Sequence, residues 1–113
     1  MERTPIFDGH NDTLLKICLP VGGEGRTFFE PSNTGYLDLP RAREGCFGGG
    51  LFVCWTPPDP ESGWTEEAAL TPTEDGYEVA DVPPLDPVYA RGTADELVKI
   101  LFRIEERPSL KAG

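Results

Sequence analysis

The run Leu51-Phe52-Val53-Cys54-Trp55 is apolar at every position, and it sharply narrows the choice of folds. A strand with one face in water alternates apolar and polar side chains, whereas a strand covered on both faces is apolar throughout. The run therefore predicts a buried strand in a parallel sheet. A glycine triplet, residues 48–50, precedes it and suits a tight turn or the close approach of another backbone.

A strand and a helix are predicted before this run. Residues 5–7 predict a short buried strand, which gives way to a loop over residues 8–12. A short helix is predicted next, over residues 13–19, and Pro20 should stop it. The glycine-rich residues 21–35 then form a loop.

Two further helices carry clear end signals. Residues 37–45 read as a helix capped by Asp38. The last helix follows Asp86-Pro87, with a capping box at residues 93–96 and an end at Pro108. Alternating strands and helices indicate a parallel α/β architecture.

Residues 57–86 differ from the rest of the chain in charge and in proline content. They hold nine acidic residues, six prolines and no Lys or Arg, whereas the remainder holds 11 acids and 10 bases. We expect a solvated loop with one helical turn near residues 66–70. The net charge of −10 argues against binding to nucleic acid or to an anionic membrane surface.

The three cysteines, Cys18, Cys46 and Cys54, are an odd number without a CxxC motif. They predict thiols in a reducing compartment, each buried as a small apolar side chain. No apolar leader follows Met1 and no apolar run approaches the roughly 18 residues of a membrane span. We therefore expect a cytoplasmic protein.

His10-Asn11-Asp12 is the cluster whose residue types best indicate a site. Residues i and i+2 of an extended segment point to the same side, so His10 and Asp12 can converge on one metal ion. Zinc accepts both imidazole nitrogen and carboxylate oxygen. A structural alternative has His10 bonded to the backbone and Asp12 capping the next helix, and the spacing leaves both interpretations open.

The string Ile6-Phe7-Asp8-Gly9-His10-Asn11-Asp12 resembles the opening of the membrane (renal) dipeptidase family, which are dizinc metallopeptidases. Two further stretches follow in the order of that family. Residues 38–45 resemble the helix after its first loop, and residues 48–57 resemble its next barrel strand. A helix through residues 97–103 also fits, so the resemblance covers most of the chain except the acidic segment.

The resemblance implies a (β/α)₈ TIM-type barrel with its site at the carboxyl ends of the strands. It implies hydrolysis of dipeptides by a zinc-activated water, with His10 and Asp12 as ligands of one of two zinc ions. In that family a glutamate on a later strand bridges the two ions, and two later histidines complete the second site.

The sequence departs from the family after its last helix. His10 is its sole histidine, no Glu-Gly-Gly strand follows, and 113 residues are fewer than the ~250 of a complete barrel. We expect residues 1–113 to be an amino-terminal fragment comprising the first two βα units, inactive alone, with a partial zinc site and no catalytic residue. Its partners would be a dipeptide substrate and the missing barrel remainder, with homodimerisation left open. The alternative is a complete non-catalytic remnant or a small acidic interaction module.

Overall fold

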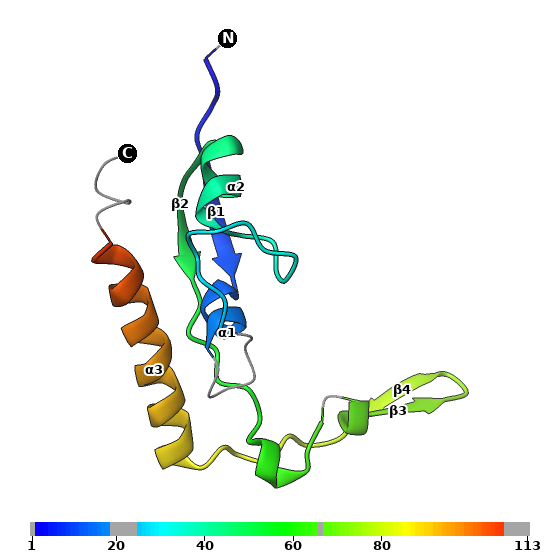
Figure 1. The fold of residues 1–113 in the computed structure, drawn as a ribbon. Coiled ribbons are helices and arrows are strands. Elements are labelled where there is room, and N and C mark those ends of the chain that lie inside the picture. Colours follow the sequence, from blue (N-terminus) through cyan, green and yellow to red (C-terminus); the bar gives the residue numbers. More distant parts are fainter. Residues whose placement is uncertain (1, 19–24, 66, 108–113) are drawn as a thin grey trace.

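The computed structural model describes residues 2–18, 25–65 and 67–107, which form a body and a projecting arm (Figure 1). The body contains β1 (Ile6–Asn11), α1 (Thr13–Ile17), α2 (Leu39–Glu44), β2 (Phe47–Phe52) and α3 (Pro87–Glu105). The arm, residues 67–82, contains the 3₁₀ turn η3 (Glu67–Ala69) and the strands β3 (Leu70–Thr73) and β4 (Gly76–Val79). A second 3₁₀ turn, η2 (Pro60–Ser62), lies in the connection from β2 to the arm.

The two strands of the body pair in parallel. Ile6 lies opposite Phe47 and Asn11 opposite Phe52, with irregular register between these ends. The glycine triplet lies inside β2, and the expected close approach is confirmed. A Cβ at Gly50 would lie 3.3 Å from the Asp8 carbonyl oxygen, and one at Gly48 would lie 3.6 Å from the Ile6 carbonyl oxygen.

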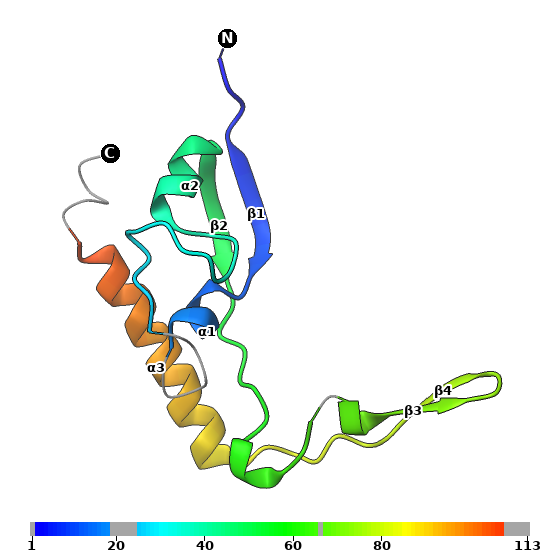
Figure 2. The same cartoon turned by 45° about the vertical axis from the view of Figure 1, so that its right-hand side comes forward.

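The boundaries predicted for both strands are wrong. β1 continues through His10 and Asn11, which were expected in a loop, and β2 ends at Phe52 rather than Trp55. The second strand is not covered on both faces within the described chain, because Leu51 is 57% exposed. Phe52 points to the opposite face and packs against the core. The helices α2 and α3 lie on the same side of this two-stranded sheet, and α2 contacts β2 (Figure 2).

The core forms where α1 meets α3. Its buried members are Leu14, Cys18, Leu97 and Ile100, and Phe52 of β2 packs against them. Helical spacing brings Leu97 and Ile100 to one side of α3, as the sequence pattern predicts. The prediction that each cysteine is buried is confirmed at Cys18. It is wrong at Cys46, which is partly exposed, and at Cys54, which is exposed.

Local chemistry determines where the helices begin. Asp38 caps α2 as predicted, and its side chain accepts a hydrogen bond from the backbone N–H of Arg41. Asp86 caps α3 in the same way. The capping box at residues 93–96 is wrong, because Thr93 lies buried within α3. The predicted stops at Pro20 and Pro108, and residues 21–24 of the predicted loop, lie outside the described residues.

The arm replaces most of the expected acidic loop. The helical turn expected near residues 66–70 is confirmed over Glu67–Ala69, but the antiparallel hairpin β3–β4 was not predicted. Leu70 pairs with Val79 and Pro72 with Tyr77, so these four side chains share one face of the hairpin. All four are exposed.

The projecting arm gives the molecule an elongated shape. Its radius of gyration is 17.5 Å, whereas a compact chain of this length has about 13 Å. Figures 1 and 2 show the hairpin extending away from the body in both views. Within the described ranges, no helix is both long and apolar enough to cross a membrane.

Candidate functional site

The candidate site lies at the carboxyl ends of β1 and β2, which meet at one edge because the strands are parallel. His10 and Asn11 end β1, and Asp12 occupies the N-cap position of α1. The Val53 N–H donates to the Asn11 carbonyl over 3.0 Å, which continues the pairing beyond β2. In parallel α/β folds, this edge is where ligands bind.

His10 and Asp12 converge as the sequence predicted. Nε2 of His10 lies 3.5 Å from Oδ2 of Asp12, and the two side chains are 66% and 47% exposed. Asp12 has φ −102° and ψ 28°, so it has already left the extended conformation. The two side chains approach each other across the bend from β1 to α1, and both are exposed to solvent there.

Asn11 fixes this bend, a role that the sequence analysis missed. Its Nδ2 donates to Asp8 Oδ2 over 2.9 Å, and its Oδ1 accepts from the Thr13 N–H over 3.3 Å. The Asn11 side chain thus accepts a hydrogen bond from a backbone N–H in the first turn of α1. The Asp12 carboxylate makes no cap hydrogen bond. The structural alternative for Asp12, a capping side chain, is therefore wrong. The signal available in the sequence was the dual donor and acceptor capacity of Asn.

Two hollows meet at His10 and Asp12. One, of about 580 Å³, runs along β1 and is lined chiefly by Ile6, Asp8, His10, Asn11, Asp12, Lys16, Arg26, Tyr36 and Phe47. The other, of about 360 Å³, is lined by His10, Asp12, Leu15, Lys16, Val53 and Trp55. Lys16 on α1 is therefore a wall of both hollows, together with the two candidate ligands.

A second positively charged side chain, that of Arg26, lies close to Lys16. A Cβ added to Gly35 would lie 3.2 Å from Nη2 of Arg26 and 3.7 Å from Cγ of Lys16. The same Nη2 donates to the Leu37 carbonyl over 2.8 Å. Gly35 has φ +73°, a conformation that favours glycine, and the missing Cβ leaves room for both side chains beside the backbone. The sequence analysis missed both cations, because they are ten residues apart in a segment predicted only as helix and loop.

The loop that carries Gly35 is held by a buried carboxylate. Asp38 is fully buried and accepts from Arg41 Nε over 2.6 Å, while Nη2 of Arg41 donates to the Ser32 carbonyl over 3.0 Å. Burial acts to raise the pKa of Asp38, but hydrogen bonds from Arg41 and Ser32 outweigh it and lower the pKa below the usual 3.8. The carboxylate is therefore charged when folded, and it positions this wall of the larger hollow.

The described residues fit half of a zinc site. An imidazole nitrogen and a carboxylate oxygen 3.5 Å apart suit one ion, but structural zinc takes four protein ligands and catalytic zinc about three. Among the described residues, no group of three or more His, Cys, Asp or Glu is placed to hold a metal ion. Any remaining ligands would have to come from water or from another segment.

A known protein is similar to this chain over part of its length. The "Uncharacterized protein in PQQ-III 3'region" of Acinetobacter calcoaceticus is 41% identical over 62 residues, which are 50% of this chain and 18% of that protein. The chain thus spans less than a fifth of the length of this curated relative. No family model matches the chain. No solved structure matches it either.

Proposed function

We propose that this chain is the amino-terminal part of a metal-dependent dipeptidase, in which His10 and Asp12 bind zinc. The observation that carries the proposal is their convergence to 3.5 Å at the carboxyl edge of two parallel strands. A zinc ion bound there would lower the pKa of a bound water and polarise the peptide carbonyl. Asn11 holds the bend that orients both ligands, and the larger hollow offers room for a small peptide.

The length of the relative supports a barrel. If 62 residues are 18% of that protein, its length is about 340 residues, above the ~250 that a (β/α)₈ barrel takes. The parallel pair β1–β2 would then be the first two strands, and the later strands would supply the remaining zinc ligands. The three thiols favour a reducing compartment, so we place the protein in the cytoplasm.

Zinc titration of the 113-residue chain tests the ligand assignment directly. Because His10 is the sole histidine, the ring ¹⁵N signals of the spectrum belong to one residue. We expect zinc to shift the Nε2 signal and its affinity to fall at least tenfold in His10→Ala and Asp12→Asn, because each removes one of two ligands. Asp75→Asn, at the tip of the arm, is the matched control and should bind as the parent does.

Unchanged zinc affinity in both ligand variants would contradict the proposal. The isolated chain should not hydrolyse dipeptides in the presence of zinc, because two ligands do not complete the site. Dipeptide turnover that disappears in His10→Ala would show that the chain alone is active, contrary to this expectation.

One observation favours the second candidate, an acidic interaction module. The arm carries an exposed apolar face of Leu70, Pro72, Tyr77 and Val79, and charges lie on its other face and at its tip. Differential scanning calorimetry separates the two candidates. A complete module would melt in one cooperative transition whose midpoint zinc does not change, whereas a fragment would give a broad transition and bind ANS.

A further inference from the structure

We propose that the arm joins two copies of this chain: the hairpin of one copy packs into a groove beside α3 of the second copy, and the second copy returns the contact. This inference goes beyond the proposed dipeptidase, because it uses neither candidate zinc ligand and needs no metal. The arm and the groove are both present in the chain, and their apolar and charged side chains are complementary.

The arm presents an apolar face that no described part of the same chain covers. Tyr77 is 69% exposed, Val79 63% and Leu70 51%, and they share this face of the hairpin with Pro72. A two-stranded hairpin on its own is at best marginally stable in water, and a layer packed on its apolar face stabilises it. A partner that covers this face would supply that layer.

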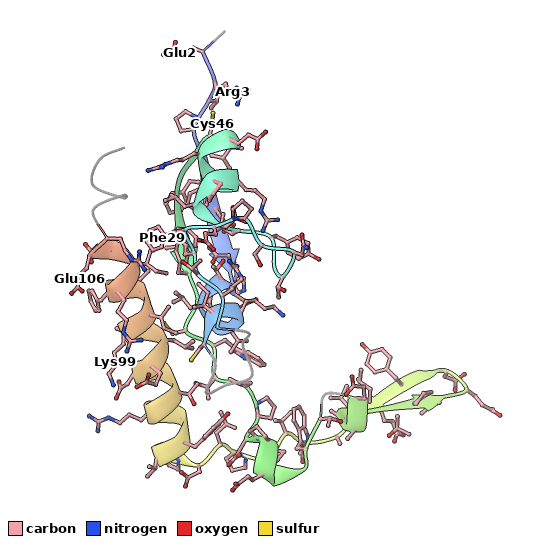
Figure 3. All side chains as sticks on the ribbon, in the orientation of Figure 1. Glu2, Arg3, Phe29, Cys46, Lys99 and Glu106 are labelled. Carbon is pink, nitrogen blue, oxygen red and sulfur yellow. The ribbon has the colours of Figure 1, made fainter. Side chains whose placement is uncertain are left out.

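A groove of matching apolar character runs beside the carboxyl-terminal half of α3, and we call it the α3 groove. Two adjoining hollows of about 520 and 240 Å³ form it, and Phe28 and Ile104 line both. Leu101 of α3 and Phe52 of β2 line the larger hollow. Phe29 lines the smaller one and lies beside the last turns of α3 (Figure 3). The groove thus offers aromatic and aliphatic walls to an apolar hairpin face.

The charges of the arm and of the groove are opposite. Residues 67–82 hold five acids and no basic residue, and Glu74 and Asp75 form the tip of the hairpin. Arg103 and Arg107 line the smaller hollow of the α3 groove, and both are exposed. Outside the acidic segment the chain is nearly neutral, with 11 acids and 10 bases, so a second body does not repel the arm as another arm would. Such complementarity favours encounter and fixes the register of an interface.

The fold separates the arm from the groove of its own chain. The arm leaves the body at the start of α3, where the Tyr89 hydroxyl lies 3.1 Å from the Pro57 carbonyl oxygen. The groove lies near Ile104, roughly 25 Å further along the helix at 1.5 Å per residue. Figures 1 and 2 show the hairpin pointing away from α3 in both views. The occupant of the groove is therefore the arm of a second copy, and exchange of both arms closes a two-fold dimer.

Sedimentation equilibrium of the 113-residue chain in EDTA tests the association. We expect a monomer–dimer equilibrium that weakens as salt is added, because the charges at the tip and at the groove are exposed. Tyr77→Ser should weaken the dimer about tenfold, because it removes the largest apolar side chain of the face. Glu78→Ser is the matched control, since Glu78 is the next residue on the opposite face and should leave the dimer as it is in the parent.

Charge reversal identifies the two surfaces that meet. Glu74→Lys with Asp75→Lys makes the tip basic, and Arg103→Glu with Arg107→Glu makes the groove acidic. Each double variant alone should dimerise about tenfold more weakly than the parent, because like charges then face each other. Mixed in equal amounts, the two variants should associate as the parent does, because each arm then meets a groove of opposite charge.

Arg91→Glu with Lys99→Glu is the control for charge on α3. Both side chains lie outside the groove, where they pair with acids of the same helix, and Lys99 points away from the sheet (Figure 3). This variant should dimerise nearly as the parent does.

A chain that remains monomeric at every concentration would overturn the inference, and so would a mixture of the two reversed variants that fails to associate. Dimers that persist in Tyr77→Ser but are lost when Phe7 and Leu51 are replaced by serine would place the interface on the open sheet, and would overturn it too. The proposed dipeptidase is decided separately, because its zinc titration follows the His10 signal whether or not the chain dimerises.

Discussion

The Asp38 carboxylate accepts three hydrogen bonds beside the candidate site. It accepts from the backbone N–H and Nε of Arg41 and from the Ser32 N–H, and it is fully buried. These bonds cap α2 and tie the loop at residues 32–35 to it. One ionised group thus links a helix start to the wall that carries Gly35.

Asp38→Asn should lower the free energy of unfolding by about 1–3 kcal/mol near neutral pH, because a charge-assisted bond is lost while the cap remains. The folded pKa of Asp38 lies below its usual 3.8, so its contribution is present above that value. It is lost as pH falls through the lowered pKa. Urea unfolding between pH 7 and pH 2 should show a smaller acid-induced loss in the variant than in the parent. Parallel curves for the two proteins would contradict this reading.

Residue roles that depend on local chemistry could be predicted from the sequence. Asp38 as a cap follows from its place just before Pro40. The convergence of His10 with Asp12 was one of two interpretations that the spacing left open, and it occurs across the bend at Asp12. The roles of Asn11 and Arg26 could not be predicted, because they depend on a bend and on a loop conformation that the neighbouring backbone sets.

Among the elements, α3 is the longest and the most regular. It runs for 19 residues, and Asp86 and Pro87 begin it. Its buried residues, Thr93, Leu97 and Ile100, face the core, and its outer face carries exposed charges. The amphipathic pattern and the start at Asp86-Pro87 were predicted from the sequence, whereas the capping box at residues 93–96 was wrong because those residues lie inside the helix.

Gly92→Ala should raise the free energy of unfolding by about 0.5–1 kcal/mol, because glycine costs that much inside a helix. Gly92 is exposed in α3, and an added Cβ meets no described atom within 4 Å. The thermal midpoint, measured by circular dichroism, checks this expectation. Gly35→Ala is the contrasting variant and should lower the midpoint, because its φ is +73° and Arg26 leaves little room. A lower midpoint for Gly92→Ala would mean that α3 tolerates no side chain there.

The arm shows why element type can be missed in a segment rich in acids and proline. Glu74 and Asp75 form the two-residue turn, Gly76 begins β4, and β3 and β4 alternate apolar and polar residues on either side of this turn. Pro72 within β3 argues against a central strand, but β3 is an edge strand, where proline is tolerated. Charge and proline content obscured a pattern that was present.

At the scale of the whole molecule, the body leaves apolar surface uncovered. Phe7 is 68% exposed and Leu51 57% exposed, both on the sheet formed by β1 and β2. A two-stranded sheet has an unpaired edge on each side, which invites further pairing. In the barrel that we propose, later strands would cover this surface.

The isolated chain should bind ANS through this surface. Replacing Phe7 and Leu51 together by serine should reduce the ANS fluorescence by about half and leave the thermal midpoint nearly unchanged, because both side chains are exposed. Leu97→Ser is the matched control, since Leu97 is fully buried and the change should unfold the chain and raise ANS binding. Equal fluorescence of the double variant and the parent would place the dye elsewhere.

The two ends of the acidic segment are fastened together. The Tyr89 hydroxyl lies 3.1 Å from the Pro57 carbonyl oxygen and 3.4 Å from that of Pro58, so the chain leaves the body and returns to it at one point. Lengthening a closed loop costs little, roughly 0.6 kcal/mol for each doubling. The body is therefore indifferent to what is inserted between residues 62 and 82. We expect a fluorescent reporter or an affinity tag placed there to leave the candidate site intact.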